Sequence, residues 1–307
     1  MEISSQVLMQ VITIMILVAV GFVCNKTGIL PDDTERPLSN LLLSVVLPAL
    51  IIDSYQREYS SAHAYGILIA FALAVISHLI GIAVSYIFVR KKGGALGIER
   101  FAVIYSNCGF MAIPLINAVI GSDGVFYSIA YVTVFNLLNW THGACMICES
   151  KKPSSILKII FSPMIISIIL AMTLYFCRIT LPDILGNAIG FIADINTPLA
   201  MIVTGICISK AGILKTIATP RAYYISFLRL ILIPVLTILL FKLLPVGKTI
   251  AMTNIIATAC SSAVSVILFA GKYQKDSLYA SKLVAVSTVL SLITIPLIVW
   301  FADFILL

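Results

Sequence analysis

Three residues in the apolar stretch from 101 to 120 have the properties of an interrupted helix: Asn107, Gly109 and Pro114. A proline inside a helix removes one hydrogen-bond donor and displaces a carbonyl group. In a bilayer the freed groups need partners from protein, water or a bound solute. The N-terminus of a broken helix attracts an anion, and freed carbonyl groups can bind a cation. We therefore predict a broken helix whose residues bind a solute.

A run of hydroxyl-bearing residues in the stretch from 249 to 270 is the counterpart of this segment. Ser261, Ser262 and Ser265 can donate hydrogen bonds to an anion, and this run contains no proline. We predict that these serines contribute to the same site. The alternative is that they are small residues at a contact between two membrane helices.

Pro48 and Pro198 stand 150 positions apart, each near the middle of an apolar stretch. Asp194 and Asn196 lie close to Pro198 in the sequence. Carboxylates at depth in a membrane are costly and mark ion or proton pathways. We predict that Pro48, Asp194, Asn196 and Pro198 form a site for a coupling ion, either Na⁺ or H⁺. The alternative for Asp194 is a hydrated position near the outer membrane surface.

Two further groups of polar residues occur within apolar stretches. Asn136 and Asn139 share one helix face, so their amides can line a cavity or bond to a neighbouring helix. Arg229 can balance the charge of an anionic solute, or its side chain can extend to the membrane surface. The seven cysteines lie within or at the ends of apolar stretches and form no disulfide framework. We expect neither a metal site nor a cofactor.

The composition limits the kind of chain that positions these residues. Apolar residues make up 61% of the 307 residues and charged residues only 11%. A soluble domain carries about 25% charged residues, so this chain has too few to cover a water-facing surface. The composition excludes soluble enzymes and nucleic-acid-binding proteins, and it predicts an all-α membrane protein that crosses the bilayer several times.

The apolar stretches predict ten transmembrane helices. They are continuous and do not alternate with a period of two, so they are helices and not the strands of a barrel. The predicted helices cover residues 6–24, 38–53, 64–89, 101–120, 125–147, 159–177, 188–208, 222–241, 249–270 and 283–304.

The basic residues predict the orientation of these helices. Loops after the first, third, fifth, seventh and ninth stretches hold 15 of the 20 lysine and arginine residues, and the opposite loops hold 4. Because basic loops stay in the cytoplasm, we expect both termini to lie outside the cytoplasmic membrane of a prokaryote. Lys91, Lys92, Lys151 and Lys152 are expected to meet anionic lipid headgroups.

The two halves of the chain, residues 1–150 and 151–307, have corresponding patterns. Each half contains five predicted helices, with a proline in its second helix and a polar run in its fourth. Halves with an odd number of crossings sit in opposite orientations. This predicts two inverted five-helix repeats in one integrated membrane domain, with helices 4 and 9 interrupted where they cross, as in secondary transporters.

The stretch from Asn107 to Leu115, followed by a Gly-Ser-Asp-Gly turn, resembles the auxin efflux carrier family. Pro48, the Ala263-Val264-Ser265 stretch and the serine-rich last helix extend this resemblance over the whole chain. The short length resembles prokaryotic members of the family. The resemblance implies crossing helices 4 and 9 at a site for small organic anions, such as dicarboxylates or auxin-like carboxylates, and often a homodimer. Family members often carry a proline near position 261 or 262, where this chain has serine.

The leading hypothesis is a secondary transporter that moves a small organic anion by alternating access. A channel or a non-transporting membrane sensor on the same fold is the alternative. An intramembrane enzyme is disfavoured because the sequence contains no H-E-x-x-H, no paired membrane aspartates and no G-x-S-x-G. Direct nucleotide hydrolysis is disfavoured because there is no Walker A sequence.

Overall fold

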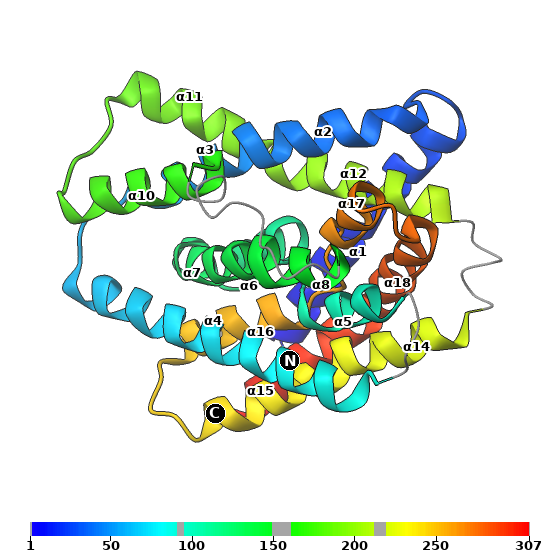
Figure 1. Cartoon of the computed structure of the whole chain (residues 1–307). Helices are drawn as coiled ribbons and strands as arrows, with labels where there is room; N and C mark the ends of the chain where they lie inside the picture. The colour runs from blue at the N-terminus through cyan, green and yellow to red at the C-terminus, as the bar shows by residue number, and fades with distance from the viewer. Residues whose placement is uncertain (1, 91–94, 149–160, 212–218, 307) are drawn as a thin grey trace.

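The computed structural model describes residues 2–90, 95–148, 161–211 and 219–306, which form helices joined by turns (Figure 1). Within these residues, six helical stretches are long and apolar enough to cross a membrane: Met9–Lys26, Glu35–Ser54, Ser61–Phe88, Asp183–Lys210, Pro220–Lys242 and Ser277–Ile305. Cys108–Val119 and Pro163–Phe176 are shorter apolar helices. The predicted all-α, multi-spanning class is confirmed. The count of ten crossings stays a prediction.

The helices of the first 150 residues follow one another with few breaks. They are α1 (Glu2–Lys26), the short 3₁₀ helix η1 (Asp32–Thr34), α2 (Glu35–Leu41), the π-helical turn η2 (Leu42–Val46), α3 (Leu47–Ser54), α4 (Ser61–Phe88), α5 (Leu96–Ile104), the π-helical turn η3 (Cys108–Ala112), α6 (Ile113–Val119), α7 (Ser122–Leu138), the π-helical turn η4 (Asn139–Gly143) and α8 (Ala144–Cys148). Lys91, Lys92, Lys151 and Lys152, for which we predicted lipid contacts, lie outside the described residues.

The second half of the chain continues in the same manner. Its helices are α10 (Pro163–Phe176), α11 (Asp183–Asp194), α12 (Asn196–Ala211), α14 (Pro220–Phe227), the π-helical turn η5 (Leu228–Leu232), α15 (Ile233–Lys242), α16 (Lys248–Ala259), α17 (Ser265–Lys272) and α18 (Ser277–Ile305).

The helices gather in two layers (Figure 1). The upper layer contains α2, α3, α10, α11 and α12, with α3 packed against α10 and α11. The lower layer contains α4 to α8 and α14 to α18, in which α16 contacts α4, α7 and α18. Helix α1 packs against α12 of the upper layer and against α18 of the lower layer. Each layer therefore combines helices from both halves of the sequence.

Three of the π-helical turns are followed by a proline two residues after they end. The pairs are η2 with Pro48, η3 with Pro114 and η5 with Pro234. A proline donates no hydrogen bond, and its ring clashes with the carbonyl group four residues earlier. A wider turn before the proline relieves this clash, which explains why the helices continue through these prolines.

Two glycines bring α1 and α12 into direct backbone contact. A Cβ atom at Gly21 would lie 2.2 Å from the Ile202 carbonyl oxygen, and one at Gly205 would lie 2.1 Å from the Val18 carbonyl oxygen. Small residues of this kind allow close packing of helices in membranes. The contact fixes α1 to the upper layer.

The fourth and ninth predicted helices are both interrupted. The first interruption covers residues 105–107, between α5 and η3, and ends seven residues before Pro114. The second covers residues 260–264, between α16 and α17, and contains no proline. The chain therefore leaves the helical path where small polar residues cluster, and Pro114 only widens the turn that follows.

Candidate functional site

The two interruptions lie side by side as a short antiparallel pair. Ser106 pairs with Ser262 in an isolated β-bridge. The backbone amide of Asn107 donates to the Ser261 carbonyl oxygen at 2.7 Å, and the backbone amide of Ala263 donates to the Tyr105 carbonyl oxygen at 2.9 Å. These bonds satisfy backbone groups that the helices no longer pair, as an apolar environment requires.

A cavity of about 300 Å³ lies beside this crossing, between the two layers. Its lining comes from the end of α2, η2 and the first residue of α3, from α7 and η4, from η3, from the start of α10, from α17 and from the two interruptions. The lining residues are Ser39, Asn40, Leu43, Ser44, Leu47, Asn107, Gly109, Phe110, Phe135, Asn136, Asn139, Trp140, Ser162, Pro163, Met164, Ile165, Ala263, Val264, Ser265, Leu268 and Phe269. The cavity therefore combines five residues that the sequence predicted as substrate-binding: Asn107, Gly109, Asn136, Asn139 and Ser265.

The polar part of the lining surrounds two helix starts. Asn107 and Gly109 flank the first residue of η3, and Ser265 is the first residue of α17. The unpaired amides of a helix start carry partial positive charge. In α17 the backbone amides of Val266 and Ile267 already donate to the carbonyl oxygens of Ala263 and Val264. Ser265 Oγ donates to Asn139 Oδ1 at 3.1 Å, which joins α17 to η4. The side-chain amide of Asn136 donates to the Val132 carbonyl oxygen at 2.7 Å, within the same helix.

The rest of the lining is apolar and aromatic. Phe110, Phe135, Trp140 and Phe269 contribute rings, and Met164 contributes a flexible side chain. None of the described residues that line this cavity is charged. The cavity therefore suits a ligand with one small polar or anionic group and an apolar body.

A larger cavity of about 780 Å³ borders the first one along α17, and Leu268 lines both. Its lining is charged and includes Asp33, Arg36 and Lys272. Glu35 and Lys210 also line it and form an ion pair of 2.6 Å. Charges of both signs suit a hydrated approach to the uncharged cavity more than a site for a single anion.

Ser261 and Ser262 lie at the crossing but do not line the cavity. Ser262 Oγ donates to the Ala102 carbonyl oxygen at 2.8 Å, and its amide donates to Ser287 Oγ at 3.1 Å. Ser261 Oγ accepts from Thr288 Oγ1 at 3.3 Å. Both serines therefore connect the crossing to neighbouring helices, mainly α18. Pro114 is buried in α6 and is also absent from the lining.

Arg229 lies in η5 and contacts the crossing, and its exposed fraction is only 1%. Its guanidinium group donates to four carbonyl oxygens of the interrupted helices. The acceptors are Val103 at 3.2 Å, Ile104 at 3.0 Å, Cys260 at 3.2 Å and Thr258. Arg229 does not line the cavity, and a direct contact with substrate stays a prediction.

The residues predicted to hold a coupling ion lie in the upper layer. The chain leaves the helix at Ile195, between α11 and α12, and Asn196 begins α12. Asn196 is 2% exposed, and neither atom of its amide has a hydrogen-bond partner within the described part of the chain. Asp194 and Pro198 are exposed and Pro48 is buried in α3. None of the four lines the cavity, and their role in coupling stays a prediction.

The contribution of α2, η2 and the start of α3 to the cavity was not predicted from the sequence. Asn40 and Ser44 are four residues apart and Leu43 and Leu47 repeat this spacing, so all four share one helix face. This spacing was visible in the sequence, in the stretch where Pro48 alone was singled out. Trp140 and Phe269 were also missed, because aromatic residues are common throughout membrane helices.

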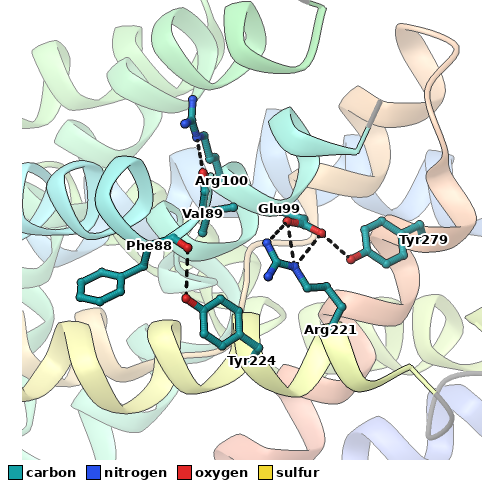
Figure 2. A network of polar contacts seen from close by, with 7 residues as sticks. All are labelled: Phe88, Val89, Glu99, Arg100, Arg221, Tyr224 and Tyr279. Carbon is teal, nitrogen blue, oxygen red and sulfur yellow. Dashed lines mark hydrogen bonds and ion pairs between the residues drawn. The ribbon is translucent and has the colours of Figure 1, made fainter. Parts of the chain in front are cut away.

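A polar network fixes the start of α5, the helix that leads into the crossing (Figure 2). Arg221 Nη2 donates to Glu99 Oε2 at 2.7 Å, and Arg221 Nε lies 3.1 Å from both carboxylate oxygens. Tyr279 donates to Glu99 Oε1 at 2.9 Å. Figure 2 shows these three side chains converging from α5, α14 and α18. The network therefore joins three helices of the lower layer.

A second polar contact joins the turn after α3 to the start of α7. Arg57, in the turn between α3 and α4, forms an ion pair with Asp123 in the first turn of α7. The Arg57 guanidinium also lies 5.0 Å from the ring centre of Phe126. Tyr55 at the end of α3 packs on Phe126 with ring centres 4.8 Å apart. We call Tyr55, Arg57, Asp123 and Phe126 the clasp, because they join the upper layer to α7.

Comparison with known proteins gives the class of this chain. A family model described as "Membrane transport protein" matches residues 6–299, so the chain belongs to this family. The resemblance to auxin efflux carriers is thereby confirmed. The chain is an integral membrane protein of a transporter family and not an enzyme.

Two archaeal proteins are similar over almost their whole length. An uncharacterized transporter of Methanothermobacter thermautotrophicus is 26% identical over 298 residues, which cover 94% of this chain and 95% of the relative. An uncharacterized transporter of Methanocaldococcus jannaschii is 21% identical over 309 residues, covering 94% of this chain and 97% of the relative.

Proposed function

We propose that this chain is a secondary transporter that binds a small organic anion in the cavity between its layers. The observation that carries the proposal is the position of the cavity beside the paired interruptions of α5–η3 and α16–α17. The start of η3 and the side-chain amides of Asn107 and Asn139 provide donors for a carboxylate. Movement of one layer against the other would expose this site to each side of the membrane in turn.

The lining favours a monocarboxylate with an apolar body, similar to an auxin, over a compact dicarboxylate. A second carboxylate in this cavity would meet rings such as Phe110 and Trp140 and no charged side chain. Burial of an anion without a partner costs several kcal/mol in protein interiors. An apolar body gains free energy from the same rings, at about 25 cal/mol per Å² of apolar surface removed from water.

The proposed arrangement has ten crossings in two inverted halves, residues 1–150 and 151–307. Both termini lie outside the cytoplasmic membrane, which puts Asn40 and the start of α10 in its cytoplasmic half and the clasp in its outer half. The proposed energy source is a gradient of Na⁺ or H⁺. The buried amide of Asn196, which lacks a partner within the described residues, supports an ion or water site at the α11–α12 break.

A thermal-shift screen of the purified protein tests the proposal. Carboxylates with an apolar body, such as indole-3-acetate, and dicarboxylates, such as malate, are compared with and without Na⁺. A ligand at roughly 100 times its Kd raises the free energy of unfolding by about 2.7 kcal/mol. We expect indole-3-acetate to raise the melting temperature more than malate. If no organic anion changes the melting temperature, the proposal is wrong.

Flux measurements in liposomes separate a transporter from a channel. A transporter saturates with substrate and shows counterflow, in which unlabelled solute inside drives uptake of labelled solute. A channel shows neither property, since its solute pathway does not alternate between two sides.

A further inference from the structure

Arg229 differs from Arg57 and Arg221 in the kind of partner it has, and it differs from Arg100, which donates to the Val89 carbonyl oxygen, in being fully buried. Arg57 pairs with Asp123 and Arg221 pairs with Glu99, so a carboxylate balances each of these charges. Arg229 donates to four neutral backbone carbonyl oxygens and also interacts with the Tyr131 hydroxyl group, and none of these partners is a carboxylate. No ion pair found among the described residues includes Arg229. Its positive charge is therefore buried without a carboxylate.

The carbonyl groups that Arg229 binds belong to the ends of two helices. Val103 and Ile104 are the last residues of α5, and Thr258 lies in the last turn of α16. The last carbonyl groups of a helix have no partner within it and carry partial negative charge. One guanidinium group therefore neutralises both helix ends and holds them together, because its planar fork donates in several directions.

The cavity begins a few residues beyond the same helix ends. Asn107 lines the cavity three positions after Ile104, and Ala263 lines it three positions after Cys260. The short non-helical segments between them form the paired crossing. In each segment the carbonyl groups bound by Arg229 thus come just before the residue that lines the cavity, although Arg229 itself is not part of the lining. In an apolar interior a charge acts over longer distances than it does in water.

We propose that Arg229 is a positioning residue for anion binding, which clamps the ends of α5 and α16 and makes the cavity electrically positive. The inference rests on the proposed function and adds the source of its selectivity for anions. A buried charge without a carboxylate is costly. A substrate anion in the cavity would offset this cost, because its negative charge would balance the positive charge of Arg229 without direct contact.

The test uses two substitutions at this position and a pair of probes. Arg229→Gln removes the charge and Arg229→Lys keeps it, although an ammonium group cannot reproduce the planar fork. Phenylacetate and phenylacetamide have the same apolar body and differ in charge. The ratio of their binding affinities measures selectivity for the anion, and the melting temperature without ligand measures the clamp.

We expect both substitutions to lower the melting temperature without ligand, because the helix ends lose hydrogen bonds. Arg229→Gln is expected to reduce the phenylacetate-to-phenylacetamide affinity ratio by roughly tenfold, the effect of about 1.4 kcal/mol. Arg229→Lys is expected to keep most of this ratio. The matched control is Arg221→Gln in α14, the helix that leads into η5. Glu99 balances the charge of Arg221. This control is expected to lower the melting temperature and leave the ratio unchanged.

Two results would overturn the inference. An Arg229→Gln protein with the parental affinity ratio means that the charge does not act on the cavity. Parental melting temperatures in both Arg229 variants mean that there is no clamp, whatever the protein transports. If the parental protein binds neither probe, the anion role of Arg229 fails. The thermal-shift screen of other organic anions then decides the proposed function, and the melting temperatures of the Arg229 variants decide the clamp.

Discussion

Four asparagine amides, those of Asn40, Asn107, Asn136 and Asn139, give the cavity much of its hydrogen-bonding capacity. An amide offers donors and an acceptor without adding charge, so it can orient a carboxylate and also be left exposed when the cavity is empty. This property fits a transporter, which has to release its substrate. A lysine in the same place would hold the anion more strongly and slow its release.

Substitution of Asn107 tests the residue scale. Asn107→Ala is expected to weaken binding of a carboxylate by roughly 10- to 100-fold, since one hydrogen bond to a charged group contributes about 1.5–3 kcal/mol. Binding is measured by titration calorimetry of the purified protein. The control is Asn117→Ala, on the exposed side of α6 and outside the cavity. Equal affinities for the parental and Asn107→Ala proteins would remove Asn107 from the site.

The types of residue in the site could be predicted from the sequence, but the directions in which they point could not. Ser261, Ser262 and Ser265 stand within five positions of one another, yet only Ser265 lines the cavity. The backbone between Cys260 and Val264 is not helical, so a helical periodicity cannot assign its side chains to a face. Arg229 is a similar case, because its partners are carbonyl groups 29 to 126 residues away in the sequence.

At the scale of elements, the proline at position 114 predicted a broken helix, but it did not indicate where the break occurs. The turn before Pro114 is π-helical and continuous with α6, while the interruption lies at residues 105–107. The second interruption needs no proline, because the paired crossing and Arg229 satisfy its backbone groups. Such long-range partners leave no local signal in the sequence, which explains why the site of a break was harder to predict than its existence.

The contact between α1 and α12 gives a prediction at this scale. Gly205→Ala is expected to lower the free energy of unfolding by about 1–3 kcal/mol, because the new methyl group meets the Val18 backbone. The melting temperature measures the effect. Gly186→Ala in α11 is the control, since no atom lies within 4 Å of its Cβ position, and it is expected to be neutral or slightly stabilising. Equal melting temperatures for the two variants would contradict the close packing.

At the scale of the whole molecule, the cavity and the clasp lie toward opposite ends of the contact between the layers. Tyr55 and Arg57 of the clasp follow the end of α3, whereas the cavity touches the end of α2, η2, the first residue of α3 and the start of α10. The Arg57 and Asp123 side chains are 22% and 48% exposed, so their ion pair contributes less than about 1 kcal/mol. A contact this weak can close one end of a transporter and still open during each cycle.

Much of this arrangement could be predicted from the sequence, because hydropathy and charge are properties of long segments. The helical class and the two polar interruptions follow from such patterns. The grouping into layers could not be predicted in the same manner, since α1 and α12 are brought together by glycines nearly two hundred residues apart. Packing of this kind depends on shape and not on composition.

Fluorescence of Trp140 tests the central claim, that the cavity between the layers binds the transported anion. The sequence has two tryptophans: Trp140 lines the cavity, and Trp300 is 53% exposed on α18. In a Trp300→Phe protein, phenylacetate is predicted to change the Trp140 emission in a saturable way, with the Kd found by calorimetry. In a Trp140→Phe protein the Trp300 emission should stay constant. A carboxylate that is transported and leaves the Trp140 emission unchanged would contradict this account.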